Sequence, residues 1–209
     1  MKTSVIIPVK SFQKSKTRLQ LSEEKTSELC RLLLREVIKT VSESGLIDEI
    51  IVVTNEKQIS DILEEYNCKK IPDLDEKSVN DAVGLAEEYL IKNKFTHSIV
   101  LPLDVPFFYP EDIKKLLDFS EEKSVIIIPS RHFDGTNALL RTPIDSMKPR
   151  YDEGSYSFQI ESAKNYNVKI CVGLIYRLML DIDSIEDLKF VIKQNVKPEF
   201  CNKIRGIIQ

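Results

Sequence analysis

Short runs of β-branched residues alternate along this chain with segments in which apolar residues recur at helical spacing. This alternation is the strongest constraint on the fold, because it requires helices to pack on a mainly parallel sheet. We therefore predict an α/β fold with a central sheet that carries helices on both faces. The strands are expected at residues 4–9, 49–54, 69–71, 97–103 and 124–129.

The first expected helix is the most clearly delimited one. Its apolar positions run from Leu29 to Val41 at every fourth residue, Ser22 can cap its start, and Gly45 can end it. One apolar stripe of this helix should pack on the sheet. Further helices are expected at residues 58–66, 79–91, 111–119, 155–166 and 185–195.

Residues 131–150 break the alternating pattern. They contain the turn pair Asp134-Gly135 and an interruption at Pro143, which favour an inserted hairpin and loop over another strand–helix unit. The chain contains no linker rich in Gly, Ser or Pro and no internal repeat. We therefore expect residues 1–209 to form one domain.

The composition narrows the functional class. Thirty basic and 33 acidic residues give a net charge of -3, which argues against a nucleic-acid-binding surface. The four cysteines form no C-x-x-C pair, so a structural zinc site is not expected, and a reducing, cytoplasmic setting fits. No apolar stretch is long enough to suggest a membrane span.

A cationic loop follows the first expected strand. Within residues 10–18 it carries Lys10, Lys14, Lys16 and Arg18, and no acidic residue precedes Glu23. A strand-to-helix loop of this kind can neutralise a compact polyanion such as a nucleoside triphosphate. A solvated charged turn is the alternative reading.

Carboxylates stand where a divalent cation could be held. Asp104 ends the expected strand 97–103, although a turn aspartate before a proline is an equally common reason for such a residue. Asp181 and Asp183 would share one side of an extended strand, and Asp183 is preferred because it lies where that strand gives way to a loop. Ser184 and Asp187 form a capping-box pattern and are assigned to helix initiation.

Two further elements could bind an anion. Gly135, Thr136 and Asn137 offer a flexible turn with a hydroxyl and an amide, although a simple hairpin turn would explain them equally well. Gly154 and Ser155 open an expected helix, whose N-terminus can bind phosphate or can carry an ordinary serine cap.

Two anion sites with carboxylates able to place a cation between them suit attack on the α-phosphorus of a nucleotide. The basic loop would then stabilise the departing pyrophosphate. An acceptor that is already a phosphate oxyanion needs no general base, and the chain has no evident Ser-His or Cys-His set.

The same residues resemble the 2-phospho-L-lactate guanylyltransferase family, over nearly the whole chain. The Gly135-Thr136-Asn137-Ala138-Leu139 element is the most particular to that family. The matching segments, in order, are Pro8-Val9-Lys10, Lys16-Thr17-Arg18-Leu19, Asn80-Asp81-Ala82, Leu103-Asp104-Val105-Pro106, Gly135 to Leu139, Gly154-Ser155 and Leu180-Asp181-Ile182-Asp183.

The resemblance implies a GT-A-like, Rossmann-related nucleotidyltransferase, often a homodimer, in coenzyme F420 biosynthesis. Such enzymes transfer GMP from GTP to 2-phospho-L-lactate, phosphoenolpyruvate or 3-phospho-D-glycerate. The implied roles are as follows: Lys10, Lys16 and Arg18 at the GTP phosphates, Asn80 at the nucleoside, Asp104 with Asp183 or Asp181 at Mg²⁺, and Thr136, Asn137, Gly154 and Ser155 at the acceptor acid.

The chain departs from the family pattern at two places. Tyr151-Asp152 stands where an aromatic-Gly pair is usual, with Gln159 in place of a His, and Ser78 replaces the Gly before Asn80. The sequence leaves the acceptor open among the three acids. It also leaves open a related nucleotidyltransferase with a molybdopterin or sugar phosphate acceptor, and a nucleotide-sensing protein without turnover.

Overall fold

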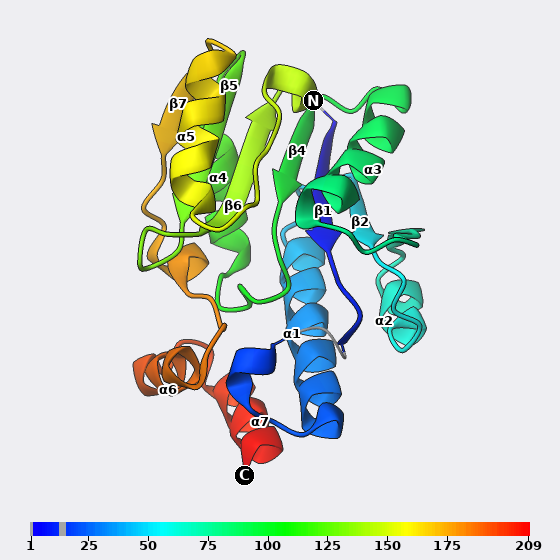
Figure 1. Ribbon diagram of the computed structural model, residues 1–209, viewed down its shortest axis with the longest axis vertical. Coiled ribbons are helices and arrows are strands. Elements are labelled where there is room, and N and C mark those ends of the chain that lie inside the picture. Colours follow the sequence, from blue (N-terminus) through cyan, green and yellow to red (C-terminus); the bar gives the residue numbers. More distant parts are fainter. Residues whose placement is uncertain (1, 13–15) are drawn as a thin grey trace.

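The computed structural model describes residues 2–12 and 16–209, and its centre is one seven-stranded sheet (Figure 1). The strands lie in the order β3-β2-β1-β4-β6-β5-β7. Their bounds are β1 (Thr3–Pro8), β2 (Glu49–Val53), β3 (Lys69–Ile71), β4 (His97–Val100), β5 (Ser124–Pro129), β6 (Thr136–Thr142) and β7 (Lys169–Val172).

The sheet is mainly parallel, as predicted. Strands β1 to β4 pair in parallel, and β5 pairs in parallel with β7. Only β6 runs against its neighbours, and it joins these two groups. Residues 131–150 do not form the predicted inserted hairpin. They contribute one strand, β6, which forms a hairpin with β5 in the interior of the main sheet.

Helices cover both faces of the sheet, again as predicted. Figure 1 shows α3 and α5 on the near face. The helices are α1 (Glu23–Glu43), α2 (Ser60–Glu65), α3 (Val79–Lys92), α4 (Pro110–Asp118), α5 (Ser155–Asn165), α6 (Ile185–Gln194) and α7 (Pro198–Ile208).

Two apolar cores follow from the alternation of side chains along each strand. In β1, Val5 and Ile7 face a core that includes Leu33 of α1 and Ile113 of α4. Ile6 faces the opposite core, which is completed by α3 and α5. Because a parallel strand is covered on both sides, its sequence is an almost continuous apolar run.

The helix boundaries obey local chemistry. The Ser22 hydroxyl accepts a hydrogen bond from Lys25 N at the start of α1, and Gly45 follows its end with φ 63°. Ser184 and Asp187 form the predicted capping box at the start of α6. No helix in the described part of the chain is long and apolar enough to cross a membrane.

Three expectations were wrong in detail. β4 ends at Val100, so Leu103 and Asp104 lie in the loop beyond it. Residues 180–183 form no strand, because Ile182 N donates to Asp104 O (3.0 Å) without a ladder of further bonds. β7 and α7 were not predicted.

Candidate functional site

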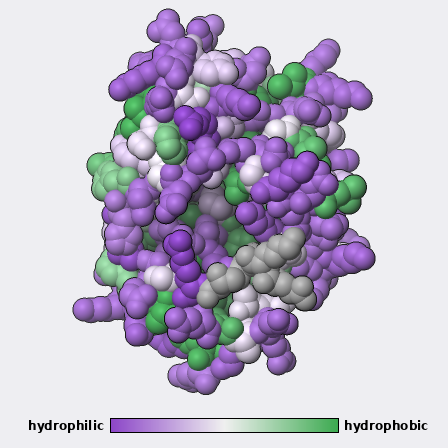
Figure 2. Space-filling view, viewed as in Figure 1, coloured by the Kyte–Doolittle hydropathy of each residue, from purple (hydrophilic) through white to green (hydrophobic). Residues whose placement is uncertain are grey.

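A crevice opens beyond the carboxyl ends of β1 and β4, where parallel sheets commonly bind ligands. Its first cavity, of about 340 Å³, is lined by Lys10, Lys16, Asp104, Thr136 and Tyr151, among others. A second cavity of about 680 Å³ shares the last three of these residues with the first. The near face of the molecule is hollowed close to its centre (Figure 2).

Lys16 joins two carboxylates that are far apart in the sequence. Its Nζ lies 2.7 Å from Asp104 Oδ2 and 2.6 Å from Asp183 Oδ1. Burial disfavours the charged ammonium, but Asp104 and Asp183 outweigh it and raise the pKa of Lys16 above its usual value. The structure thus brings together the cationic loop and both predicted acidic segments.

Asp181 lies beside this ion pair and is poorly satisfied. Its Oδ1 is buried and accepts no hydrogen bond from the described residues. Burial, together with the nearby carboxylates of Asp104 and Asp183, raises the pKa of Asp181 to about 7. A partly buried carboxylate with one unsatisfied oxygen, close to two other carboxylates, fits a hard divalent cation, which prefers carboxylate oxygens.

The carboxylates do not form a preassembled metal cluster. Among residues 2–12 and 16–209, no three His, Cys, Asp or Glu side chains are grouped closely enough to hold a metal ion. The Lys16 ammonium provides the positive charge between Asp104 and Asp183 instead.

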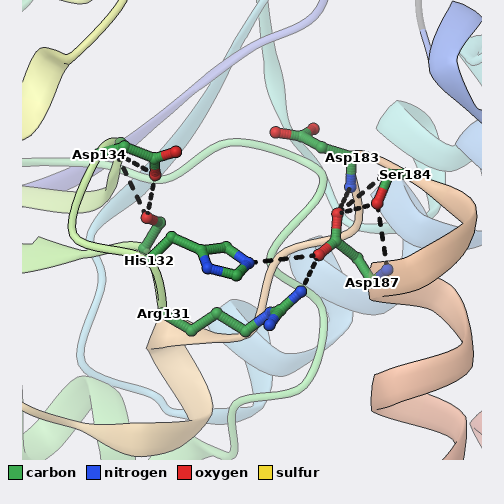
Figure 3. Close-up of polar contacts among 8 residues, drawn as sticks. Arg131, His132, Asp134, Asp183, Ser184 and Asp187 are labelled. Carbon is green, nitrogen blue, oxygen red and sulfur yellow. Dashed lines mark hydrogen bonds and ion pairs between the residues drawn. The ribbon is translucent and has the colours of Figure 1, made fainter.

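Asp183 is held in place from the start of α6 (Figure 3). The Asp187 Oδ2 accepts hydrogen bonds from the backbone N–H groups of Asp183 (3.2 Å) and Ser184 (2.8 Å). The other Asp187 oxygen pairs with Arg131 and lies 4.0 Å from His132 Nε2. Asp187 therefore caps the helix, as predicted, and also ties it to the loop after β5.

The second cavity gathers the residues predicted for an acceptor. Thr136, Asn137, Gly154 and Ser155 line it together with Arg18, Asp181 and Asp183. The Ser155 hydroxyl donates to Thr136 Oγ1 at 3.1 Å, so it joins the two predicted anion-binding elements. The N-cap of α5 is Gly154, with φ 80°, which rules out the ordinary serine cap at Ser155.

Asn80 has a partner within the protein. Its Oδ1 accepts from Tyr151 N at 2.7 Å, and its Nδ2 approaches Asp152 Oδ1 at 3.5 Å. The buried Gln159 amide adds two hydrogen bonds to the Arg150 backbone. Asn80 and Gln159 therefore brace residues 150–152. Of these two, Gln159 departs from the family pattern, and Asp152, which also departs from it, lies 3.7 Å from Arg150 Nε.

The basic residues of the cationic loop line different cavities. Lys10 is exposed and lines the first cavity, whereas Arg18 is exposed and lines the second. Lys14 lies outside the described residues.

Sequence reasoning missed two residues of the crevice. Tyr151 lines both cavities, and burial raises the pKa of its hydroxyl above the usual value. Asp73 is a nearly buried acid in the wall of the first cavity. Its position after β3, at the same edge of the sheet as Lys10, was the available signal.

Comparison with known proteins gives concordant results. The family described as Guanylyl transferase CofC like matches residues 3–205. The chain is 30% identical to a 2-phospho-L-lactate guanylyltransferase from Methanobrevibacter smithii, covering 90% of this chain and 82% of that protein. It is 29% identical to a phosphoenolpyruvate guanylyltransferase from Conexibacter woesei, covering 90% and 86%.

A 3-phospho-D-glycerate guanylyltransferase from Colwellia psychrerythraea is also 29% identical, with 91% of each chain covered. Among solved structures, a nucleotidyl transferase from Methanothermobacter thermautotrophicus shares the fold at a TM-score of 0.70 and 12% identity, covering 94% of this chain and 99% of that one. With a family match over almost its whole length, the chain belongs to the Guanylyl transferase CofC like family.

Proposed function

We propose that this protein transfers GMP from GTP to a small phosphorylated three-carbon acid and releases pyrophosphate, in coenzyme F420 biosynthesis. The observation that carries the proposal is the meeting of Lys16 with Asp104 and Asp183, which are 88 and 167 residues away in the sequence. A cation and carboxylates at one crevice are what nucleotidyl transfer requires. The family match and the three relatives support the same reaction.

In this proposal the first cavity receives GTP. Lys10 and Lys16 neutralise its phosphates from the loop that follows β1, and Arg18 reaches the phosphates from the border of the second cavity. Asn80 acts near the nucleoside by bracing the Tyr151 backbone at the cavity wall. Asp104, Asp183 and Asp181 are the residues that would hold Mg²⁺, and bound Mg²⁺ would supply positive charge to the phosphates.

The acceptor occupies the second cavity, next to Thr136, Asn137, Gly154 and Ser155. Its phosphate oxygen forms a bond to the α-phosphorus of GTP, and the bond from that phosphorus to the bridging oxygen of pyrophosphate breaks. Lys10 and Lys16 stabilise the negative charge that accumulates on pyrophosphate. The attacking oxygen is already anionic, so no side chain has to remove a proton.

The three named relatives use three different acids, and we propose that one of these is the acceptor here. Residues 1–209 would act as one nucleotidyltransferase domain, in a homodimer. A reducing cytoplasmic setting is proposed because Cys30, Cys68, Cys171 and Cys201 are all free thiols.

The test is to incubate the purified protein with GTP, Mg²⁺ and each acid separately and to measure pyrophosphate. We expect release with one acid, loss of release with EDTA, and a fall of at least about 1000-fold in Asp104→Asn. Asp118→Asn is the matched control, because this exposed carboxylate on α4 lines none of the cavities described above. No release with any of the three acids would reject the proposed substrates.

A further inference from the structure

Three acidic residues are buried in the described part of the chain, and two of them pair with an arginine. They are Asp73, Asp112 and Asp187, with exposed fractions of 6%, 1% and 7%. Asp112 pairs with Arg177, and Asp187 pairs with Arg131. No ion pair reaches Asp73 from any described residue. A buried carboxylate without a cation destabilises the folded state, so its presence in a cavity wall points to a ligand.

Asp73 lines the cavity that we assign to GTP. It follows β3, and its Oδ1 accepts one hydrogen bond from Glu76 N at 3.0 Å. A carboxylate can accept about four hydrogen bonds through its two oxygens, so capacity remains for a donor from the cavity. The same cavity wall includes the apolar side chains of Pro8, Val79 and Ala82.

The lysines and Asp73 lie at different ends of this cavity, which suits the phosphates at one end and the base at the other. Lys10 and Lys16 follow β1, and Asp104 follows β4, which is the neighbour of β1. Asp73 follows β3, two strands from β1 on the opposite side, a displacement of about 9–10 Å at normal strand spacing. Phosphates at the lysines would thus leave the apolar wall to the flat base, with Asp73 at its edge.

We propose that Asp73 reads the guanine base, by accepting hydrogen bonds from its N1–H and 2-amino groups. This inference rests on the proposed function and adds the residue that sets base specificity. Among the common bases, only guanine presents two adjacent donors on its Watson–Crick edge. Adenine and cytosine place an acceptor lone pair beside their single amino group, and uracil flanks its one donor with two carbonyls, so each would leave a buried acceptor unmatched.

The test uses Asp73→Asn, which preserves the shape and reverses half of the hydrogen-bonding pattern. Xanthine carries a carbonyl in place of the 2-amino group of guanine, so the N–H of the introduced amide can donate to it while the amide oxygen accepts from N1–H. We expect GTP affinity to fall at least about 100-fold in the variant and xanthosine triphosphate affinity to rise above that of wild type. Binding is measured by calorimetry, and turnover with both nucleotides by pyrophosphate release.

Asp75→Asn provides the matched control. It makes the same change two residues away, at an exposed carboxylate paired with Lys77, and GTP affinity should remain as in wild type. The melting temperature of Asp73→Asn, measured alongside, checks that the variant is folded.

The outcomes separate this inference from the proposed function. Equal losses for GTP and xanthosine triphosphate would overturn it, since they would indicate a ribose contact or a structural role. Wild-type protein that binds ATP as well as GTP would overturn it too. If wild-type protein prefers GTP and the variant switches as expected, but none of the three acids is turned over, the acceptor assignment fails and the role of Asp73 stands.

Discussion

Lys16 serves as an internal counter-ion for two carboxylates that would otherwise repel each other. Its ammonium lies within hydrogen-bonding distance of both Asp104 and Asp183, and the Lys16 and Asp104 side chains are largely buried whereas Asp183 is half exposed. The buried part of this ion pair is screened less than a surface pair, so removal of the ammonium leaves the repulsion between the two carboxylates uncompensated. A divalent cation that binds the same carboxylates must displace the ammonium, which is then free to turn to nucleotide phosphates.

Replacement of Lys16 by Met should therefore separate metal binding from catalysis. We expect Mn²⁺ to bind Lys16→Met roughly 10-fold more tightly than wild type in the absence of nucleotide, because the competing ammonium is gone. Turnover should fall at least about 100-fold, because the phosphates lose a cation. Electron paramagnetic resonance of free Mn²⁺ measures the first effect. Unchanged or weaker Mn²⁺ binding would contradict the competition.

Asp181 predicts a dependence of stability on pH when divalent ions are absent. Its folded pKa of about 7 lies above the unfolded value of 3.8, so between these values the folded state holds a proton that the unfolded state lacks. The contribution of Asp181 to the free energy of unfolding therefore falls as pH rises from about 4 to 7 and is constant above that. Asp181→Asn stays neutral throughout.

The variant and wild type should melt at similar temperatures near pH 4.5, and the variant should melt several degrees higher at pH 8, in EDTA. Circular dichroism across the pH range measures the difference between the two proteins. A difference that does not change with pH would show that the Asp181 carboxyl does not titrate in this range.

At the scale of secondary-structure elements, the ion pair of Arg131 and Asp187 links the loop after β5 to the start of α6. The same Asp187 carboxylate holds the backbone N–H of Asp183, and the Arg131 guanidinium stacks 4.6 Å from the Phe190 ring. Asp183 is thus oriented by a contact between elements far apart in the sequence. Arg131 acts as a positioning residue, because it reaches Asp183 only through Asp187.

Arg131→Met should loosen this arrangement while Asp183 itself remains. We expect kcat to fall about 10-fold to 100-fold with little change in the KM for GTP, because a misplaced Asp183 weakens catalysis more than nucleotide binding. Arg131→Lys should restore part of kcat. Steady-state kinetics measures kcat and the KM for GTP separately, with Lys114→Met in the exposed ion pair of α4 as the control. A rise in the KM for GTP with an unchanged kcat would contradict the positioning role.

Most helices and strands could be predicted because their determinants are local. Ser78 accepts a hydrogen bond from Asp81 N at the start of α3, and Ser184 and Asp187 form the capping box of α6. Yet α7 was missed, because what holds it is distant: Lys197 Nζ donates to Glu36 Oε1 and Thr40 Oγ1 of α1 at 2.7 and 2.9 Å. Residues 180–183 have strand-like alternation but find no partner strand.

The same distinction between local and distant determinants applies to the site. Lys10, Lys16 and Asp104 were predicted because each follows a strand whose carboxyl end faces the crevice. Tyr151 was missed because its place in the crevice depends on burial, which a single sequence does not reveal. Asp73 was missed although its position after β3 was a usable signal. Ser155 was predicted to bind an anion and lines the second cavity, but its bond to Thr136 depends on how α5 packs beside β6.

At the scale of the whole molecule, β6 unites the two parts of the sheet. It pairs with β4 on one side and β5 on the other, and its Arg141 is fully buried, with Glu87 of α3 2.5 Å from its guanidinium. The crevice lies along this seam, since Thr136 begins β6 and lines both cavities. Disruption of the sheet on one side of β6 should therefore destabilise the sheet on the other side.

We expect the protein to unfold in a single cooperative transition. Far-ultraviolet circular dichroism reports the helices throughout, whereas tyrosine fluorescence reports local packing, and the two urea curves should coincide. A plateau between separate transitions would show that the parts on either side of β6 unfold independently.

The position of β6 also has a consequence for biosynthesis. Chains emerge from the ribosome N-terminus first, so β1 to β4 are available while β6 is still unmade. Until Thr142 has emerged, β4 presents an open row of backbone N–H and C=O groups, the kind of edge that recruits foreign strands. A nascent chain stalled between β4 and β6 is thus the species of this protein most in need of a chaperone.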